Sequence, residues 1–143
     1  MRMTMILAAG LAVAACGQGE GASIPGDDGD ASPYSGIAED EILHFTGTEP
    51  FWGGEVSNGQ LRWSTPENID GRTIPVERFA GRGGISFSGN LQGASFDMTV
   101  TPGECSDGMS DRDYPFTVTV AWGEETRFGC GWSDSEPYSG DGA

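Results

Sequence analysis

Apolar and polar side chains alternate along residues 116–122, where every second residue is large and apolar. This period of two is typical of a β-strand with one buried face. After a turn near Gly123, the same spacing returns at Phe128, Cys130 and Trp132. We therefore predict a hairpin in which Cys130 lies on the core face.

A second hairpin is predicted at residues 55–62, because Asn58-Gly59 is a preferred sequence for a two-residue type I′ turn. In that register Val56 and Leu61 face each other on the apolar side of the pair. The other facing pairs are Glu55 with Arg62 and Gly54 with Trp63.

Further strands are predicted at residues 42–46, 73–79, 85–88 and 95–101. Pro75 lacks an N–H donor, so we expect residues 73–79 to form an edge or bulged strand. Turn residues recur along the chain without helical spacing between them. The total of about eight strands predicts an all-β fold, a small antiparallel β-barrel or sandwich, and alternation does not separate the two.

Composition divides the chain into four parts. Residues 1–15 are a predicted lipoprotein signal peptide, residues 16–40 a lipidated cysteine and flexible linker, residues 41–132 the β domain, and residues 133–143 a disordered tail. Linker and tail are rich in Gly, Asp and Ser and have little apolar surface to bury. The core of so small a domain is marginal, so a covalent cross-link would help to stabilise it.

The N-terminus has the pattern of a lipoprotein signal: a positive charge at Arg2, a short apolar run, and the small residues of VAAC at 13–16. We predict that Cys16 is acylated and anchors the mature protein to a membrane on its periplasmic face. A plain secretory signal with an incidental cysteine is the alternative. Gly17 follows Cys16, rather than the Asp that retains many lipoproteins at the inner membrane, so we expect the outer membrane by analogy.

The two other cysteines are predicted to form a disulfide. Once Cys16 is assigned to lipid, Cys105 and Cys130 remain as a pair in an exported, oxidising context. A metal site is the alternative, but this spacing and a single histidine, His44, match no zinc pattern. We therefore expect no metal and no cofactor.

The formal net charge is −15, from 22 acidic and 7 basic residues, and lysine is absent. Phosphate binding requires clustered cations, so nucleic acids and anionic lipid headgroups are poor partners. The acidity either keeps an exported protein soluble or attracts a basic protein partner, whose encounter it would accelerate. We expect a monomer.

The sequence contains no complete catalytic motif, so we predict no catalytic residues. Residues 108–112 (GMSDR) differ from a nucleophile elbow because Arg replaces its second Gly. His44 alternates with apolar Ile42, which favours a partly buried structural histidine over a general base. A hydrolase that uses two carboxylates stays open, because the chain has many acidic residues and sequence does not give their separation.

Residues 105–115 are predicted to form a turn-rich loop that the disulfide ties to the C-terminal hairpin. Asp111 is expected to cap local backbone N–H groups. One interpretation is a loop held only by its own hydrogen bonds. The other is a rigid recognition edge, with Asp107, Met109, Asp111 and Tyr114 as candidate partner-binding residues and Met109 and Tyr114 as its apolar contacts.

Residues 49–52 (EPFW), residues 105–115 (CSDGMSDRDYP) and Gly129-Cys130 resemble a family of uncharacterised bacterial lipoproteins with E-P-F-W and C-x-D-G-M-S-D-x-x-Y-P motifs. The likeness covers about residues 42–132. More distantly, the chain is similar to META-domain lipoproteins and membrane-bound inhibitors of c-type lysozyme. The resemblance implies a β domain at the cell envelope, and a lysozyme as one basic partner. We expect a lipid-anchored binding or inhibitory module, with an envelope hydrolase or a structural lipoprotein as alternatives.

Overall fold

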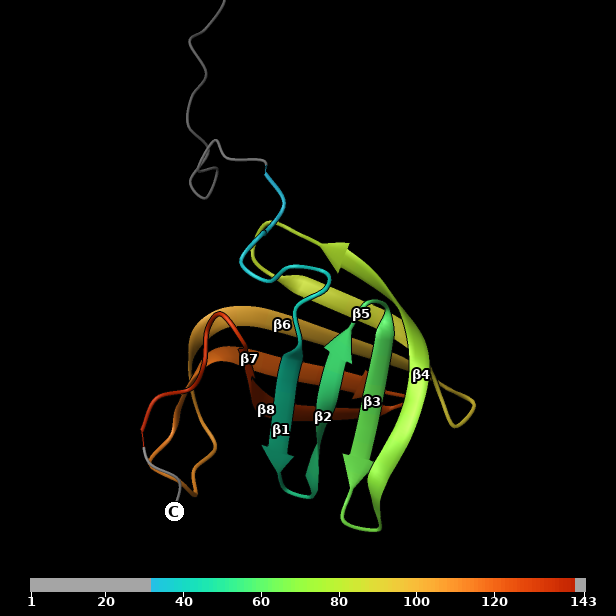
Figure 1. Ribbon diagram of the computed structural model, residues 1–143. Coiled ribbons are helices and arrows are strands. Elements are labelled where there is room, and N and C mark those ends of the chain that lie inside the picture. Colours follow the sequence, from blue (N-terminus) through green and yellow to red (C-terminus); the bar gives the residue numbers. More distant parts are fainter. Residues whose placement is uncertain (1–31, 141–143) are drawn as a thin grey trace, which may run out of the picture. The chain divides into compact units, whose positions relative to one another are not determined.

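Eight antiparallel strands form a closed barrel in residues 32–140, the part of the chain that the computed structural model describes (Figure 1). Each strand pairs with its neighbours in sequence, and β8 pairs back to β1. This confirms the predicted all-β fold and shows that it is a barrel rather than a sandwich. In chain order the strands are β1 (Leu43–Thr48), β2 (Phe51–Ser57), β3 (Gln60–Thr65), β4 (Asn68–Ala80), β5 (Ile85–Leu91), β6 (Ala94–Ser106), β7 (Asp113–Trp122) and β8 (Glu125–Ser133).

Some predictions concern residues that the structure does not describe. Residues 1–31 and 141–143 lie outside the described part, and with them the signal peptide, Cys16 and most of the linker. Among residues 32–140, no helix is long and apolar enough to cross a membrane.

The β2–β3 hairpin has the register predicted from its turn residues. Asn58 and Gly59 both have positive φ angles, 49° and 73°, as a type I′ turn requires. Val56 pairs with Leu61, and both side chains are buried in the core. The pairs Glu55 with Arg62 and Gly54 with Trp63 are also as predicted.

Side chains fill the barrel interior, as expected for a closed barrel of this size. Strands β1 to β7 all contribute apolar side chains to one core. Its aromatic centre includes Trp52 and Trp63, whose rings stack with centroids 5.0 Å apart, and Phe45 packs against both. Strand β8 contributes no apolar side chain to this core, because Gly129 and Gly131 lie opposite the buried Val118 and Phe116.

The prediction that Cys130 lies on the core face is wrong. Val118 points into the barrel and pairs with Gly129, so a glycine holds the inward position of β8. The Trp52 ring fills the space beside it, because a Cβ at Gly129 would lie 2.9 Å from that ring. Cys130 and Phe128 therefore point outward. Phe128 is 70% exposed, whereas Cys130 is buried beneath another segment of the chain.

Pro75 lies inside the long strand β4, which is not the edge strand that we predicted, because the barrel is closed. It pairs with Gln60 at the end of the ladder with β3, and the ladder with β5 begins at Val76. The missing N–H therefore falls where the strand changes partner. The register shift between β3 and β4 lies elsewhere, between Trp63 and Thr65.

The packed part of the chain extends past both predicted boundaries of the β domain. Ile37, which the composition assigns to the linker, is buried in the core. Ser139, which the composition assigns to the disordered tail, exchanges two backbone hydrogen bonds with Asp113. Tyr138 packs beside it against two other aromatic rings. Composition missed these contacts because single apolar side chains stand among many polar residues.

Candidate functional site

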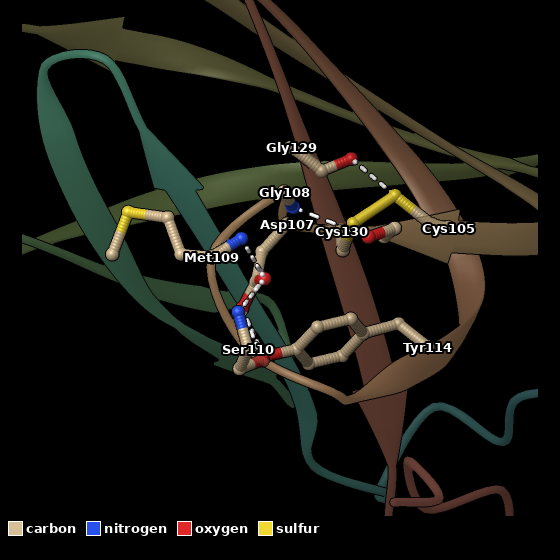
Figure 2. The surroundings of a disulfide bond; sticks show 9 residues. Cys105, Asp107, Gly108, Met109, Ser110, Tyr114, Gly129 and Cys130 are labelled. Carbon is tan, nitrogen blue, oxygen red and sulfur yellow. Dashed lines mark hydrogen bonds between the residues drawn. A yellow bond between two sulfur atoms is a disulfide. The ribbon is translucent and has the colours of Figure 1, made fainter. Parts of the chain in front are cut away.

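The Cys105–Cys130 disulfide holds the loop between β6 and β7 on the outer face of the barrel (Figure 2). The bond is the one that the sequence predicts, and it joins Cα atoms that lie 5.6 Å apart. The pairing of β6 with β7 shifts between Pro102 and Cys105, after which Cys105 lies opposite Tyr114. The disulfide therefore fixes the base of a loop that spans residues 107–112.

Asp107 organises this loop. Its carboxylate accepts hydrogen bonds from the backbone N–H groups of Met109 and Ser110, at 2.9 and 2.8 Å. It also accepts hydrogen bonds from the hydroxyls of Ser110, at 2.8 Å, and Tyr114, at 3.2 Å. These donors, first the Ser110 N–H, lower the pKa of Asp107 from 3.8 to about 2. Both carboxylate oxygens are used inside the loop, so Asp107 positions the loop and does not offer a free charge to a partner.

The buried side chain of Tyr114 supports the loop. It is only 2% exposed, and its ring centroid lies 5.5 Å from that of Trp132 and 5.6 Å from that of Tyr138. Figure 2 shows the ring directed toward Asp107 and Ser110. The prediction that Tyr114 contacts a partner is therefore wrong, because the C-terminal segment and β8 enclose its side chain.

Met109 and Asp111 are the candidate residues that the loop exposes. Met109 is 60% exposed, and in Figure 2 its side chain points away from the disulfide and from Tyr114. Asp111 is also exposed, and within residues 33–140 its carboxylate makes no hydrogen bond or ion pair. The capping that we predicted for Asp111 is done by Asp107.

A cavity of about 170 Å³ lies between the loop and the barrel wall. Ser106, Asp107 and the disulfide line it on one side, and Phe128 lines it from β8. Sequence reasoning missed Phe128 because the alternation assigned it to the core. The length of the β7–β8 turn could have revealed the outward position of Phe128. A two-residue turn pairs even-numbered residues of β7 with odd-numbered residues of β8, so the even-numbered Phe128 does not share the buried face of β7. We call the side chains of Met109, Asp111 and Phe128, together with this cavity, the loop surface.

His44 lies on the outer face of β1, stacked on Trp132 with ring centroids 5.1 Å apart. Its Nδ1 is 3.8 Å from Glu55 Oε2, and its Nε2 is 3.6 Å from Asp134 Oδ1. Between His44 and residues 33–140 there is no hydroxyl–imidazole hydrogen bond, so this part of the chain shows no serine–histidine pair. Nor do the described residues bring together three side chains that could hold a metal ion.

Comparisons with protein-family models, curated proteins and solved structures give no match for this chain. The likeness to lipoprotein families that its motifs suggest therefore stays a prediction. The features of this chain that bear on its function are the geometry of the loop surface, the net charge and the N-terminal sequence.

Proposed function

We propose that this protein is a lipid-anchored binding module of the bacterial cell envelope, which captures a basic protein through the loop surface. The observation that carries the proposal is the exposed Met109 on a loop held by a disulfide and by Asp107, beside a cavity that the exposed Phe128 lines. Exposed apolar side chains on and beside such a loop are typical of interaction sites. A loop that is already ordered loses little conformational entropy when it binds.

The charge of the molecule favours a basic partner. The chain has a net charge of −15 and no lysine. The arginine in the loop, Arg112, is engaged within the protein, because its guanidinium lies 4.4 Å from the centre of the Tyr138 ring. The acidic surface would speed the encounter with a basic protein, and desolvated contacts at Met109 and Phe128 would then hold it.

The N-terminal sequence supports the envelope location. The segment that ends in Cys16 predicts acylation, and the Cys105–Cys130 disulfide suits an oxidising compartment. Gly17 favours delivery to the outer membrane. A lysozyme of the c type is the specific basic protein that the motif resemblance suggests, and an inhibitory role would follow if the loop surface covers its catalytic cleft.

The experiment is a binding assay with the full-length protein, purified in detergent and immobilised for biolayer interferometry. The ligand is c-type lysozyme, and the control is the same lysozyme with its lysines acetylated. We expect binding to the unmodified protein only, with an association rate that falls as salt rises from about 0.05 to about 0.5 M. Absence of binding to lysozyme and to the basic proteins of a periplasmic extract would reject the proposal.

A further inference from the structure

A second cavity opens on the outer face of β4, β5 and β6, beside the turn from β4 to β5. Figure 1 shows where these three strands lie in the barrel. Its volume is about 340 Å³, and it shares no lining residue with the cavity of the loop surface. None of its lining residues is charged, although the chain carries 22 acidic and 7 basic side chains. We call this cavity the neutral groove. Its lining includes Phe79, Gly81, Gly83, Ser86, Thr99 and Thr101.

Phe79 forms one wall of the neutral groove. Its side chain is 69% exposed, and its neighbour across the β4–β5 ladder is Ser86. A Cβ at Gly81 would lie 3.6 Å from Phe79 Cε1, so the phenyl ring lies over a glycine and no side chain covers it from that position. The ring takes no part in the barrel core, so packing does not explain a large aromatic residue at this place.

Hydroxyl groups lie next to the ring. Ser86 pairs with Thr99 across the β5–β6 ladder, and Thr101 follows two residues later on the same face of β6. None of these three side chains makes a hydrogen bond within residues 33–140. The β4–β5 turn lies close against β6, because a Cβ at Gly84 would be 2.2 Å from the carbonyl oxygen of Val100. The groove therefore combines one exposed aromatic ring with three available hydroxyls.

We propose that the neutral groove binds an uncharged pyranose oligosaccharide. The Phe79 ring offers the apolar area that can pack on the C–H face of a sugar ring. The hydroxyls of Ser86, Thr99 and Thr101 both donate and accept hydrogen bonds, which matches the hydroxyls of a saccharide. A volume of about 340 Å³ falls within the range of small-ligand sites.

The uncharged lining of the neutral groove disfavours charged ligands. A cation or an anion would lose hydration in the neutral groove without gaining a counter-charge from its lining. An anion would also approach a molecule whose net charge is −15. A neutral saccharide loses no ion hydration and is not repelled by the net charge. Its hydroxyls can take the place of water as hydrogen-bonding partners of Ser86, Thr99 and Thr101.

The test is a titration of the full-length ¹⁵N-labelled protein, in detergent, with chitotetraose and with cellotetraose. These probes separate a sugar with N-acetyl groups from one without them. We expect millimolar or tighter binding of at least one, with chemical-shift changes concentrated at Gly81, Gly83, Ser86 and Thr99. No shift with either saccharide, or shifts confined to other parts of the barrel, would overturn the proposal.

Two variants test whether the saccharide binds in the neutral groove. Phe79→Ala should weaken binding about tenfold, whereas Phe51→Ala, which removes another exposed phenyl ring outside the groove, should leave it unchanged. Gly83→Glu should abolish binding, because it puts a charged side chain at a residue that lines the groove, and it should not disturb the fold, because a Cβ at Gly83 would meet nothing within 4 Å. Equal affinity of Phe79→Ala and the wild type would show that the ring is not part of the site.

Discussion

The disulfide offers the clearest quantitative prediction, because it closes a chain segment of known length. The perturbation is the double replacement of Cys105 and Cys130 by serine. The two residues are 25 positions apart in sequence. Loop-closure entropy for a segment of that size gives a stabilisation of about 3.5 kcal/mol, which the variant should lose. For a domain of this size, that loss should lower the melting temperature by about 15 °C or more.

The variant should nevertheless keep its fold. The β6–β7 ladder continues past the disulfide to the pair of Ser106 and Asp113, and Asp107 ties the loop through hydrogen bonds that need no cross-link. The barrel core also lies on the other side of the sheet from Cys130. The loss should therefore appear in the free energy of unfolding, with little change in the native spectrum.

The assay is urea unfolding followed by tryptophan fluorescence on the oxidised wild type, the reduced wild type and the double variant. The reduced wild type is the control and should match the variant, and reductant should have no effect on the variant. A free energy of unfolding for the variant within about 1 kcal/mol of the oxidised wild type would contradict this stabilising effect of the disulfide. Such a result would mean that the unfolded chain is about as restricted without the cross-link as with it, or that strain in the native disulfide offsets its stabilising effect.

Three further predictions concern Asp107, Gly129 and Cys16. Asp107→Asn should cost about 1 kcal/mol near neutral pH, since the amide keeps only one of the two acceptor oxygens of this partly exposed carboxylate and none of its charge. The folded pKa of Asp107, about 2, is lower than its ordinary value of 3.8, so this stabilisation is present above pH 3.8 and disappears as pH falls through about 2. Urea unfolding of wild type and variant should converge in that window, and a constant difference would contradict the assignment. Gly129→Ala would place a Cβ 2.2 Å from a backbone carbonyl oxygen and 2.9 Å from the Trp52 ring, so we expect a loss of about 2 kcal/mol or more, measured by thermal unfolding. The control is Gly83→Ala, because a Cβ at Gly83 would have no atom within 4 Å. Equal stability of the two variants would argue against tight packing around Gly129 in β8. Mass spectrometry of the membrane fraction should find Cys16 with a diacylglycerol group, and an unmodified thiol would end the lipoprotein interpretation.

The strands and one hairpin could be predicted from the sequence because their signals are local. Asn58-Gly59 prefers the positive φ angles of its turn, and the register of β2 with β3 follows from the turn length alone. The pairing of Cys105 with Cys130 followed from counting cysteines. That the sheet closes into a barrel could not be predicted, because the same alternation describes a sandwich.

The errors at the candidate site arose where contacts are distant in sequence. Tyr114 was assigned to the loop because it precedes Pro115, and only the fold brings Tyr138 and Trp132 around it. Asp107 and Asp111 look alike in sequence, but only Asp107 has two backbone N–H groups and the Tyr114 hydroxyl within hydrogen-bonding distance. These arrangements depend on tertiary packing, which local patterns do not contain.

The clearest test of binding through the loop surface is the dissociation rate of bound lysozyme from loop-surface variants. The double variant Met109→Ser with Phe128→Thr removes both exposed apolar contacts and leaves the disulfide in place. The control is Ile69→Thr, which shortens an apolar side chain that is 79% exposed and lies outside the loop surface. Binding through the loop surface predicts at least about tenfold faster dissociation for the double variant, with the wild-type rate for the control. Wild-type dissociation from the double variant, or equal acceleration in the control, would contradict it.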